Sequence, residues 1–136
     1  MTSQPRVLIV DDEDRFRSTL RKLLSVRGIE AADAGSAREA YAVLGSGAFD
    51  VILLDVKMPD INGIEALAEI KKQHPEVEVI ILTGHASVDA AVEIMQLGGY
   101  EYLLKPCPVD ELMLKIEAAY ERKLARQKRQ TVPESR

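Results

Sequence analysis

Short apolar runs alternate with amphipathic segments along most of the chain, and this alternation constrains the fold more than any other feature. Four runs consist almost wholly of apolar side chains, at residues 6–10, 50–54, 77–82 and 100–104, and a weaker run lies at residues 28–33. Apolar runs that do not alternate with polar residues indicate short β-strands that are covered on both faces of a sheet.

Segments with apolar residues at helical spacing follow the strands. One of them opens with Ser36 and has Glu39 three residues later, which is the pattern of a capping box at a helix start. Another carries an apolar stripe at i, i+3, i+4 and i+7, formed by Val88, Ala91, Val92 and Met95. Such a stripe indicates the face that a helix packs against the core. The chain is therefore interpreted as a strand followed by a helix, repeated five times.

This order predicts an α/β fold, with a doubly wound parallel sheet between two layers of helices. A chain of 136 residues is long enough for one ordinary domain and too short for two. We expect a domain over residues 1–122 and a basic, polar C-terminal tail over residues 123–136 that is partly disordered and frays beyond about residue 125.

Charge is distributed unevenly along the chain. Residues 1–121 hold 12 Lys and Arg against 21 Asp and Glu, a net charge of −9, whereas residues 122–136 hold 6 against 1, a net charge of +5. An acidic body repels phosphate backbones, so it is not expected to bind nucleic acid. DNA binding through the RKLARQKRQ segment is an alternative, although a solvated end to the last helix explains these charges more simply.

The sequence also indicates the cellular setting. Its apolar runs are too short to cross a bilayer and its N-terminus lacks a signal-type core, so no membrane contact and a cytoplasmic location are expected. The single cysteine, Cys107, cannot form an intramolecular disulfide, which fits a reducing compartment. We interpret it as a small packed thiol, with a redox role as the alternative.

Polar side chains follow the strong strands, at the edge where function gathers in parallel sheets. Asp11 and Asp12 follow the first strand, Asp55 the third, Thr83 the fourth and Lys105 the fifth. Because carboxylate oxygens are the ligands that Mg²⁺ prefers, the cluster is interpreted as a divalent-metal site, with oxygens from Asp12 and Asp55, water and a backbone carbonyl as its ligands. Taken singly, the same residues could be helix-start carboxylates, a turn residue and a strand-end hydroxyl.

The set suits phosphoryl transfer. A metal ion neutralises phosphoryl oxygens, while Lys105 and Thr83 supply further charge and hydrogen bonds. Asp55 would be the nucleophile that forms an acyl phosphate.

Four motifs in this order, VLIVDDE, VILLDVKMPDING, VIILTGHAS and YLLKP, resemble the receiver domain of two-component response regulators over about residues 5–122. The resemblance implies a flavodoxin-like (βα)5 fold with strand order 2-1-3-4-5. It also implies phosphorylation at Asp55, metal binding by Asp11, Asp12, Asp55 and the Lys57 carbonyl, and Mg²⁺ as the cofactor, with Mn²⁺ able to replace it. Thr83 and Lys105 would contact the phosphoryl group, and the Lys105–Pro106 bond would be cis.

The resemblance further implies a switch and its partners. Tyr102 matches the aromatic position that changes rotamer with Thr83 on activation, and Lys57 and His85 match positions that tune the lifetime of the acyl phosphate. The phosphodonor would be a histidine kinase or a phosphotransfer protein. A downstream protein target, or a second copy of the chain, would bind the face formed by the fourth helix, the fifth strand and the fifth helix.

Two alternatives remain open at this stage. A magnesium phosphohydrolase of the haloacid-dehalogenase type also uses a strand-end aspartate, but its motif needs Thr or Val where this chain has Phe16. A phosphoacceptor is not an enzyme in this sense, since it catalyses only its own phosphorylation and dephosphorylation. The chain could also be a receiver fragment of a longer transcriptional regulator.

Overall fold

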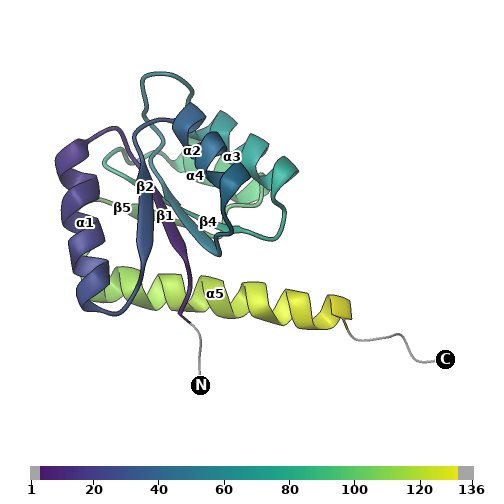
Figure 1. The fold of residues 1–136 in the computed structure, drawn as a ribbon. Coiled ribbons are helices and arrows are strands. Elements are labelled where there is room, and N and C mark those ends of the chain that lie inside the picture. Colours follow the sequence, from purple (N-terminus) through teal and green to yellow (C-terminus); the bar gives the residue numbers. More distant parts are fainter. Residues whose placement is uncertain (1–3, 132–136) are drawn as a thin grey trace.

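A parallel five-stranded sheet forms the centre of the computed structural model, which describes residues 4–131 (Figure 1). The strands are β1 (Val7–Val10), β2 (Ala31–Ala34), β3 (Val51–Leu54), β4 (Glu78–Thr83) and β5 (Glu101–Leu104). The helices are α1 (Asp14–Val26), α2 (Ala37–Ser46), α3 (Gly63–Gln73), α4 (Val88–Gln96) and α5 (Val109–Thr131). The strand order is β2-β1-β3-β4-β5, which confirms the predicted flavodoxin-like fold.

Two apolar clusters, one on each face of the sheet, make up the core. Alternate residues of the central strands point to opposite faces. Leu8, Ile52 and Ile81 therefore pack with α2, α3 and α4, whereas Ile9, Leu53 and Ile80 pack with α1 and α5. Every residue of β1, β3 and β4 is buried, as the continuous apolar runs predict. The three central strands are thus rigid supports for whatever follows them.

Local signals in the sequence match the observed helix ends and turns. The Ser36 hydroxyl accepts a hydrogen bond from the Glu39 backbone N–H at 3.1 Å, which confirms the predicted cap of α2. Gly28 ends α1 with a φ of 84°, a conformation that only glycine adopts without strain. The Lys105–Pro106 peptide bond is cis, as the family resemblance implies.

The predicted buried face of α4 is wrong. Val88, Val92 and Met95 are exposed, with 81%, 52% and 48% of their surface accessible, and Ile94 is the buried residue of the helix. Helix α4 carries apolar residues on two faces, so periodicity alone cannot choose between them. The tertiary fit decides instead, because Ile94 belongs to the buried cluster that also contains Leu67 of α3 and Ile81 of β4.

Helix α5 continues to Thr131, beyond the point near residue 125 at which fraying was expected (Figure 1). The physical reason is a set of ion pairs at the amino edge of the sheet. Lys123 Nζ lies 2.5 Å from Asp50 Oδ1, and Arg126 Nη2 lies 2.7 Å from Glu78 Oε2. The predicted tail therefore begins as helix over residues 123–131, while residues 132–136 lie outside the described part of the chain.

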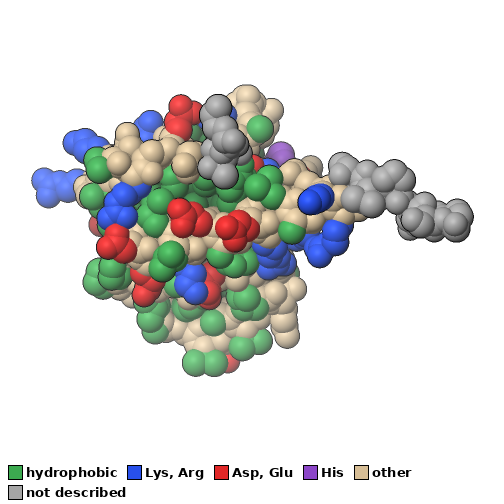
Figure 2. Space-filling model, turned by 90° about the horizontal axis from the view of Figure 1, so that it is seen from below, with side chains coloured by type: hydrophobic (Ala, Val, Ile, Leu, Met, Phe, Trp, Pro, Cys, Tyr) green, Lys and Arg blue, Asp and Glu red, His purple; other side chains and the backbone are tan. Residues whose placement is uncertain are grey.

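These ion pairs also explain part of the basic charge near the C-terminus. Figure 2 shows Lys and Arg side chains along the C-terminal part of the molecule and also on the opposite side of this face, with several Asp and Glu side chains between them. Lys123 is buried and Glu78 is fully buried, so the pairs between α5 and the sheet are internal contacts. Within residues 4–131, no helix combines the length and apolar character needed to cross a membrane.

Candidate functional site

The carboxyl ends of the strands bring the predicted site residues together. Val10 is paired with Leu54 in neighbouring strands, so Asp11 and Asp55 leave the sheet at the same level. Both are nearly inaccessible, with 2% and 8% of their surface exposed, whereas Asp12 is exposed. One carboxylate oxygen from each of Asp11, Asp12 and Asp55 lies within 4.8 Å of the others.

This cluster has the donor chemistry of a hard-cation site. Burial of carboxylates without a balancing charge is unfavourable. The Asp55 Oδ1 atom is buried and has no hydrogen-bond partner among the described residues, so it offers a free acceptor inside the cluster. Oxygen donors at this spacing fit Mg²⁺ or Mn²⁺. The Asp11, Asp12 and Asp55 set is thus suited to the ion that the sequence predicts.

Lys105 supplies the cation of the site. Its ammonium lies 2.5 Å from Asp11 Oδ2, 3.5 Å from Asp55 Oδ2 and 4.1 Å from the centre of the Phe16 ring. Burial by itself would lower the pKa of Lys105, but the hydrogen bond and charge of Asp11 and the charge of Asp55 outweigh it and raise the pKa above its ordinary value. Lys105 therefore stays charged at neutral pH and faces both carboxylates.

Backbone contacts hold the loop that carries Asp55. The Gly63 N–H donates a hydrogen bond to the Val56 carbonyl at 2.7 Å, which folds the loop between β3 and α3 back on itself. A Cβ on Gly63 would lie 2.3 Å from the Asp55 carbonyl oxygen and 2.5 Å from the Val56 Cα. This contact is too close for any side chain, so the path of the loop requires glycine.

Thr83 and Tyr102 are linked through one residue of the loop between β4 and α4. The His85 N–H donates to the Thr83 hydroxyl oxygen at 3.4 Å, and the His85 carbonyl accepts from the Tyr102 hydroxyl at 2.6 Å. The same hydroxyl accepts from the Ser87 N–H at 3.2 Å. A shift of the Thr83 side chain would therefore disturb the loop that Tyr102 holds.

The two residues that are predicted to tune the lifetime of the acyl phosphate are exposed to solvent. Lys57 and His85 are both exposed, two residues after Asp55 and Thr83 respectively. Their effect on an acyl phosphate, and the role of the Lys57 carbonyl as a metal ligand, stay predictions.

Sequence reasoning missed three residues that shape the site. Phe16 packs against the Lys105 ammonium, Gly63 allows the close loop contact, and Arg17 donates a hydrogen bond to the Asp11 carbonyl at 2.7 Å. Phe16 looked like a core residue of α1, and Gly63 like an ordinary turn glycine. The sequence pattern did not indicate the role of Arg17, because its three hydrogen-bond acceptors come from separate places in the sequence.

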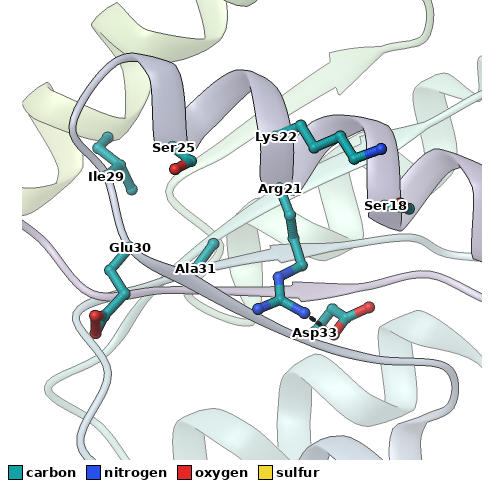
Figure 3. A pocket seen from close by; sticks show the side chains of 8 residues that line it. All are labelled: Ser18, Arg21, Lys22, Ser25, Ile29, Glu30, Ala31 and Asp33. Carbon is teal, nitrogen blue, oxygen red and sulfur yellow. Dashed lines mark hydrogen bonds and ion pairs between the residues drawn. The ribbon is translucent and has the colours of Figure 1, made fainter.

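Among the hollows on the described part of the molecule, two border helix α1. One, of about 400 Å³, lies between α1 and the edge strand β2, and an ion pair between Arg21 and Asp33 crosses it (Figure 3). It shares no residue with the strand-end cluster. A smaller apolar hollow of about 100 Å³ lies between α1 and α5, and Phe16, Lys105 and Cys107 contribute to its wall.

The fold and this site together define a class of α/β signalling proteins, in which acidic residues and one lysine meet at the carboxyl edge of a doubly wound sheet. The family model for the response regulator receiver domain matches residues 7–117. The chain belongs to this family, and the resemblance predicted from four sequence motifs is confirmed. Receiver domains generally bind Mg²⁺ at an acidic pocket and are generally not enzymes.

Curated relatives are bacterial regulatory proteins. The chain is 42% identical over 111 residues to the alginate biosynthesis transcriptional regulatory protein AlgB of Pseudomonas aeruginosa, a match that covers 82% of this chain and 25% of AlgB. It is 38% identical over 113 residues to the DNA-binding transcriptional regulator NtrC of Salmonella typhimurium, covering 83% of this chain and 24% of NtrC. The chain thus spans about a quarter of the length of these relatives.

Solved structures agree with this membership. A CheY-like response regulator receiver domain protein from Methanospirillum hungatei superposes with a TM-score of 0.87 at 31% identity, covering 91% of this chain and 99% of the other. The beryllofluoride-activated NtrC4 receiver domain dimer superposes with a TM-score of 0.82 at 42% identity, covering 87% and 98%. Receiver domains of response regulators interact with histidine kinases and can dimerise, as the NtrC4 receiver domain does.

Proposed function

We propose that this receiver domain accepts a phosphoryl group on Asp55 from the phosphohistidine of a histidine kinase or a phosphotransfer protein. The observation that carries the proposal is the Asp55 carboxylate itself. It is 8% exposed, one of its oxygens has no hydrogen-bond partner among the described residues, and Lys105 lies 3.5 Å from the other. An acceptor that is buried but unpaired, beside a fixed cation, is ready to bond an incoming phosphorus atom.

Asp11, Asp12 and Asp55 would hold a divalent cation, with the Lys57 carbonyl as a further ligand. When bound, Mg²⁺, or Mn²⁺ in its place, supplies charge neutralisation at the phosphoryl oxygens. The side chains of this chain do the remaining work. The Lys105 ammonium attracts one phosphoryl oxygen, and the Thr83 hydroxyl donates a hydrogen bond to another.

The transfer forms one bond and breaks one. An Asp55 oxygen attacks phosphorus in line, while the bond between phosphorus and the donor nitrogen breaks. The donor imidazole leaves with the electron pair of that bond and takes up a proton, and an acyl phosphate remains on Asp55. Hydrolysis by water later restores the carboxylate, at a rate that we expect Lys57 and His85 to tune. The chain thus catalyses only its own phosphorylation and dephosphorylation.

The phosphorylated state would act through the β4–α4 loop. Movement of the Thr83 side chain toward the phosphoryl group would alter the contact in which the Thr83 hydroxyl oxygen accepts from the His85 N–H. Because the His85 carbonyl also holds the Tyr102 hydroxyl, the loop and Tyr102 would shift together. The result is a change in the populations of two states, which a partner that prefers one state detects.

The surface that reports the state would be the face of α4, β5 and α5. Its exposed apolar residues include Val88, Val92 and Met95 of α4 and Leu104 of β5. Apolar side chains that remain exposed along one face commonly mark a protein interface. The occupant would be a second copy of the receiver, as in the NtrC4 dimer, or a downstream protein.

The whole protein would be a longer cytoplasmic transcriptional regulator. AlgB and NtrC are named as transcriptional regulators, and each is about four times as long as the region that this chain matches. Residues 1–122 would form its receiver domain, and residues 123–136 the start of the connection to the rest.

The decisive experiment is a mass measurement after incubation with Mg²⁺ and acetyl phosphate. We expect the wild type to gain the mass of one phosphoryl group and Asp55→Asn to gain none. Asp60→Asn is the matched control, since Asp60 is an exposed aspartate on the same loop, and it should gain the same mass as the wild type. An equal gain in Asp55→Asn, or none in the wild type, would overturn the proposal.

A further inference from the structure

Arg17 connects the loop that carries the acidic residues to the edge of the sheet. Its side chain is only 14% exposed. The Nη1 group donates to the Asp11 backbone carbonyl at 2.7 Å, Nε donates to Asp33 Oδ2 on β2 at 2.9 Å, and Nη2 donates to Asp14 Oδ1 at 2.6 Å. One guanidinium therefore binds the end of β1, the start of α1 and the neighbouring strand together.

The contact with the Asp11 carbonyl fixes a peptide plane. That carbonyl belongs to the peptide bond between Asp11 and Asp12, so its direction sets where Asp12 leaves the backbone. The Asp11 side chain is held separately, by the Glu13 N–H at 2.9 Å and by Lys105 at 2.5 Å. By contrast, the exposed Asp12 carboxylate has no hydrogen-bond or ion-pair partner within residues 4–131. Its position depends on the backbone alone.

The surroundings of Arg17 fit this single arrangement. A Cβ on Gly35 would lie 3.1 Å from the Arg17 Nη1 atom, so the guanidinium fills the space that glycine leaves. Burial by itself would lower the pKa of Arg17, but its hydrogen bonds with Asp33 and Asp14 outweigh it and raise the pKa. The side chain therefore carries its positive charge at neutral pH.

We infer that Arg17 is a positioning residue for the cation site, and that it acts by holding the peptide between Asp11 and Asp12 in the orientation in which the Asp12 carboxylate faces Asp11 and Asp55. The inference rests on the proposed function, because it assigns Arg17 to the divalent cation that phosphoryl transfer uses. Groups that orient the ligands of a metal, without touching it, commonly change its affinity by about tenfold or more when they are removed.

The direction in which removal of Arg17 changes Mg²⁺ affinity distinguishes a positioning role from the effect of its charge alone. Arg17 carries a positive charge close to a site for a dication, so removing that charge should strengthen Mg²⁺ binding if charge alone matters. If Arg17 positions Asp12, its removal should weaken Mg²⁺ binding instead.

Arg21 provides the matched control. It also pairs with Asp33, at 3.1 Å, and lies on the same helix, as Figure 3 shows. In the part of the chain that the structure describes, Arg21 donates to Asp33 and makes no hydrogen bond to the Asp11 carbonyl. The variant Arg21→Met therefore removes a similar charge and a shared ion pair, but leaves the peptide between Asp11 and Asp12 held by Arg17.

The test is calorimetric titration of the full chain with MgCl2, paired with phosphorylation by acetyl phosphate at increasing Mg²⁺. For Arg17→Met we expect a Kd for Mg²⁺ that is about tenfold higher. The Mg²⁺ concentration for half-maximal phosphorylation should rise by the same factor, with most of the maximal rate recovered at saturating Mg²⁺. Arg21→Met should bind Mg²⁺ as the wild type does or slightly more tightly.

Arg17→Lys keeps the charge but cannot reach three acceptors at once, and it should weaken Mg²⁺ binding by a smaller factor. Circular dichroism establishes that each variant is folded, and Arg17→Lys carries the test if Arg17→Met is not. Unchanged or tighter Mg²⁺ binding in the folded Arg17 variants would overturn the inference, as would an equal loss in Arg21→Met. A wild type that binds Mg²⁺ without gaining a phosphoryl group would instead refute the proposed function.

Discussion

The close contact between Gly63 and the Asp55 loop predicts opposite effects for the same substitution at two glycines. In Gly63→Ala, the new Cβ would lie 2.3 Å from the Asp55 carbonyl oxygen and 2.5 Å from the Val56 Cα. In Gly45→Ala, nothing lies within 4 Å of the new Cβ, and the residue is exposed within α2. The alanine at position 63 must displace the backbone of Asp55 and Val56, whereas the alanine at position 45 only stabilises helix α2.

The magnitudes follow from these distances. An ordinary Cβ contact begins at 3.4 Å, so the Asp55 backbone must move by about 1 Å in Gly63→Ala. Overpacking of this kind typically destabilises a protein by about 3 kcal/mol at its upper range. For a domain of this size that loss corresponds to a fall in Tm of roughly 8 °C. Gly45→Ala should raise the free energy of unfolding by about 0.5 kcal/mol through helix propensity.

Function should suffer more than stability in Gly63→Ala. A displacement of about 1 Å in a reacting group can reduce a rate by about a hundredfold. We therefore expect phosphorylation of Asp55 by acetyl phosphate to be much slower in Gly63→Ala at a temperature where the variant is folded. Urea unfolding and the rate of phosphoryl mass gain are the two measurements. If Gly63→Ala matches Gly45→Ala in both, the loop does not need glycine and the reasoning is refuted.

Three further predictions concern other parts of the molecule. Lys123→Met should lower the free energy of unfolding, measured in urea, by about 2 kcal/mol, because it leaves the partly buried Asp50 without its cation. The control Arg129→Met, at an exposed residue of α5, should have almost no effect. Equal losses of unfolding free energy in the two variants would contradict the packing of α5 against the sheet. Cys107 should react with iodoacetamide more slowly than glutathione at pH 8, because burial raises the pKa of its thiol above its ordinary value, and a faster reaction would exclude a packed thiol. Val92→Asp should change Tm by no more than about 2 °C, since its side chain is exposed, and a loss of several kcal/mol would mean that this face of α4 is buried.

The strand ends were predictable from the sequence because they depend on local pattern. A continuous apolar run must be buried, so the first polar residue after it must lie at the sheet edge, and this reasoning located Asp11 and Asp55. Lys105 also follows a strand, but that strand, β5, has no buried residue. The buried face of α4 was not predictable, because both of its faces are apolar and the choice depends on the packing of Ile94 in the core cluster with residues of α3 and β4. Contacts between distant segments decided that outcome.

Helix α5 and Arg17 illustrate the same limit for polar residues. The basic residues after position 122 looked like a solvated tail, because the sequence does not reveal that Asp50 and Glu78 lie beside them in the folded chain. Arg17 belongs to none of the motifs in the sequence, although its side chain binds acceptors in β2 and at the end of β1. Ion pairs of this kind connect residues far apart in sequence, and no periodic pattern records them.

The distribution of buried residues fits the proposed control of a movable surface by a rigid acceptor. Every residue of β1 and β3, the strands that end at Asp11 and Asp55, is buried, whereas α4 has a single buried residue and β5 has none. Parts of a protein with few buried contacts open and shift at the lowest free-energy cost. A phosphoryl group on Asp55 would therefore leave the strands that carry it in place and change the α4–β5 side instead, which is joined to the site through Thr83 and His85.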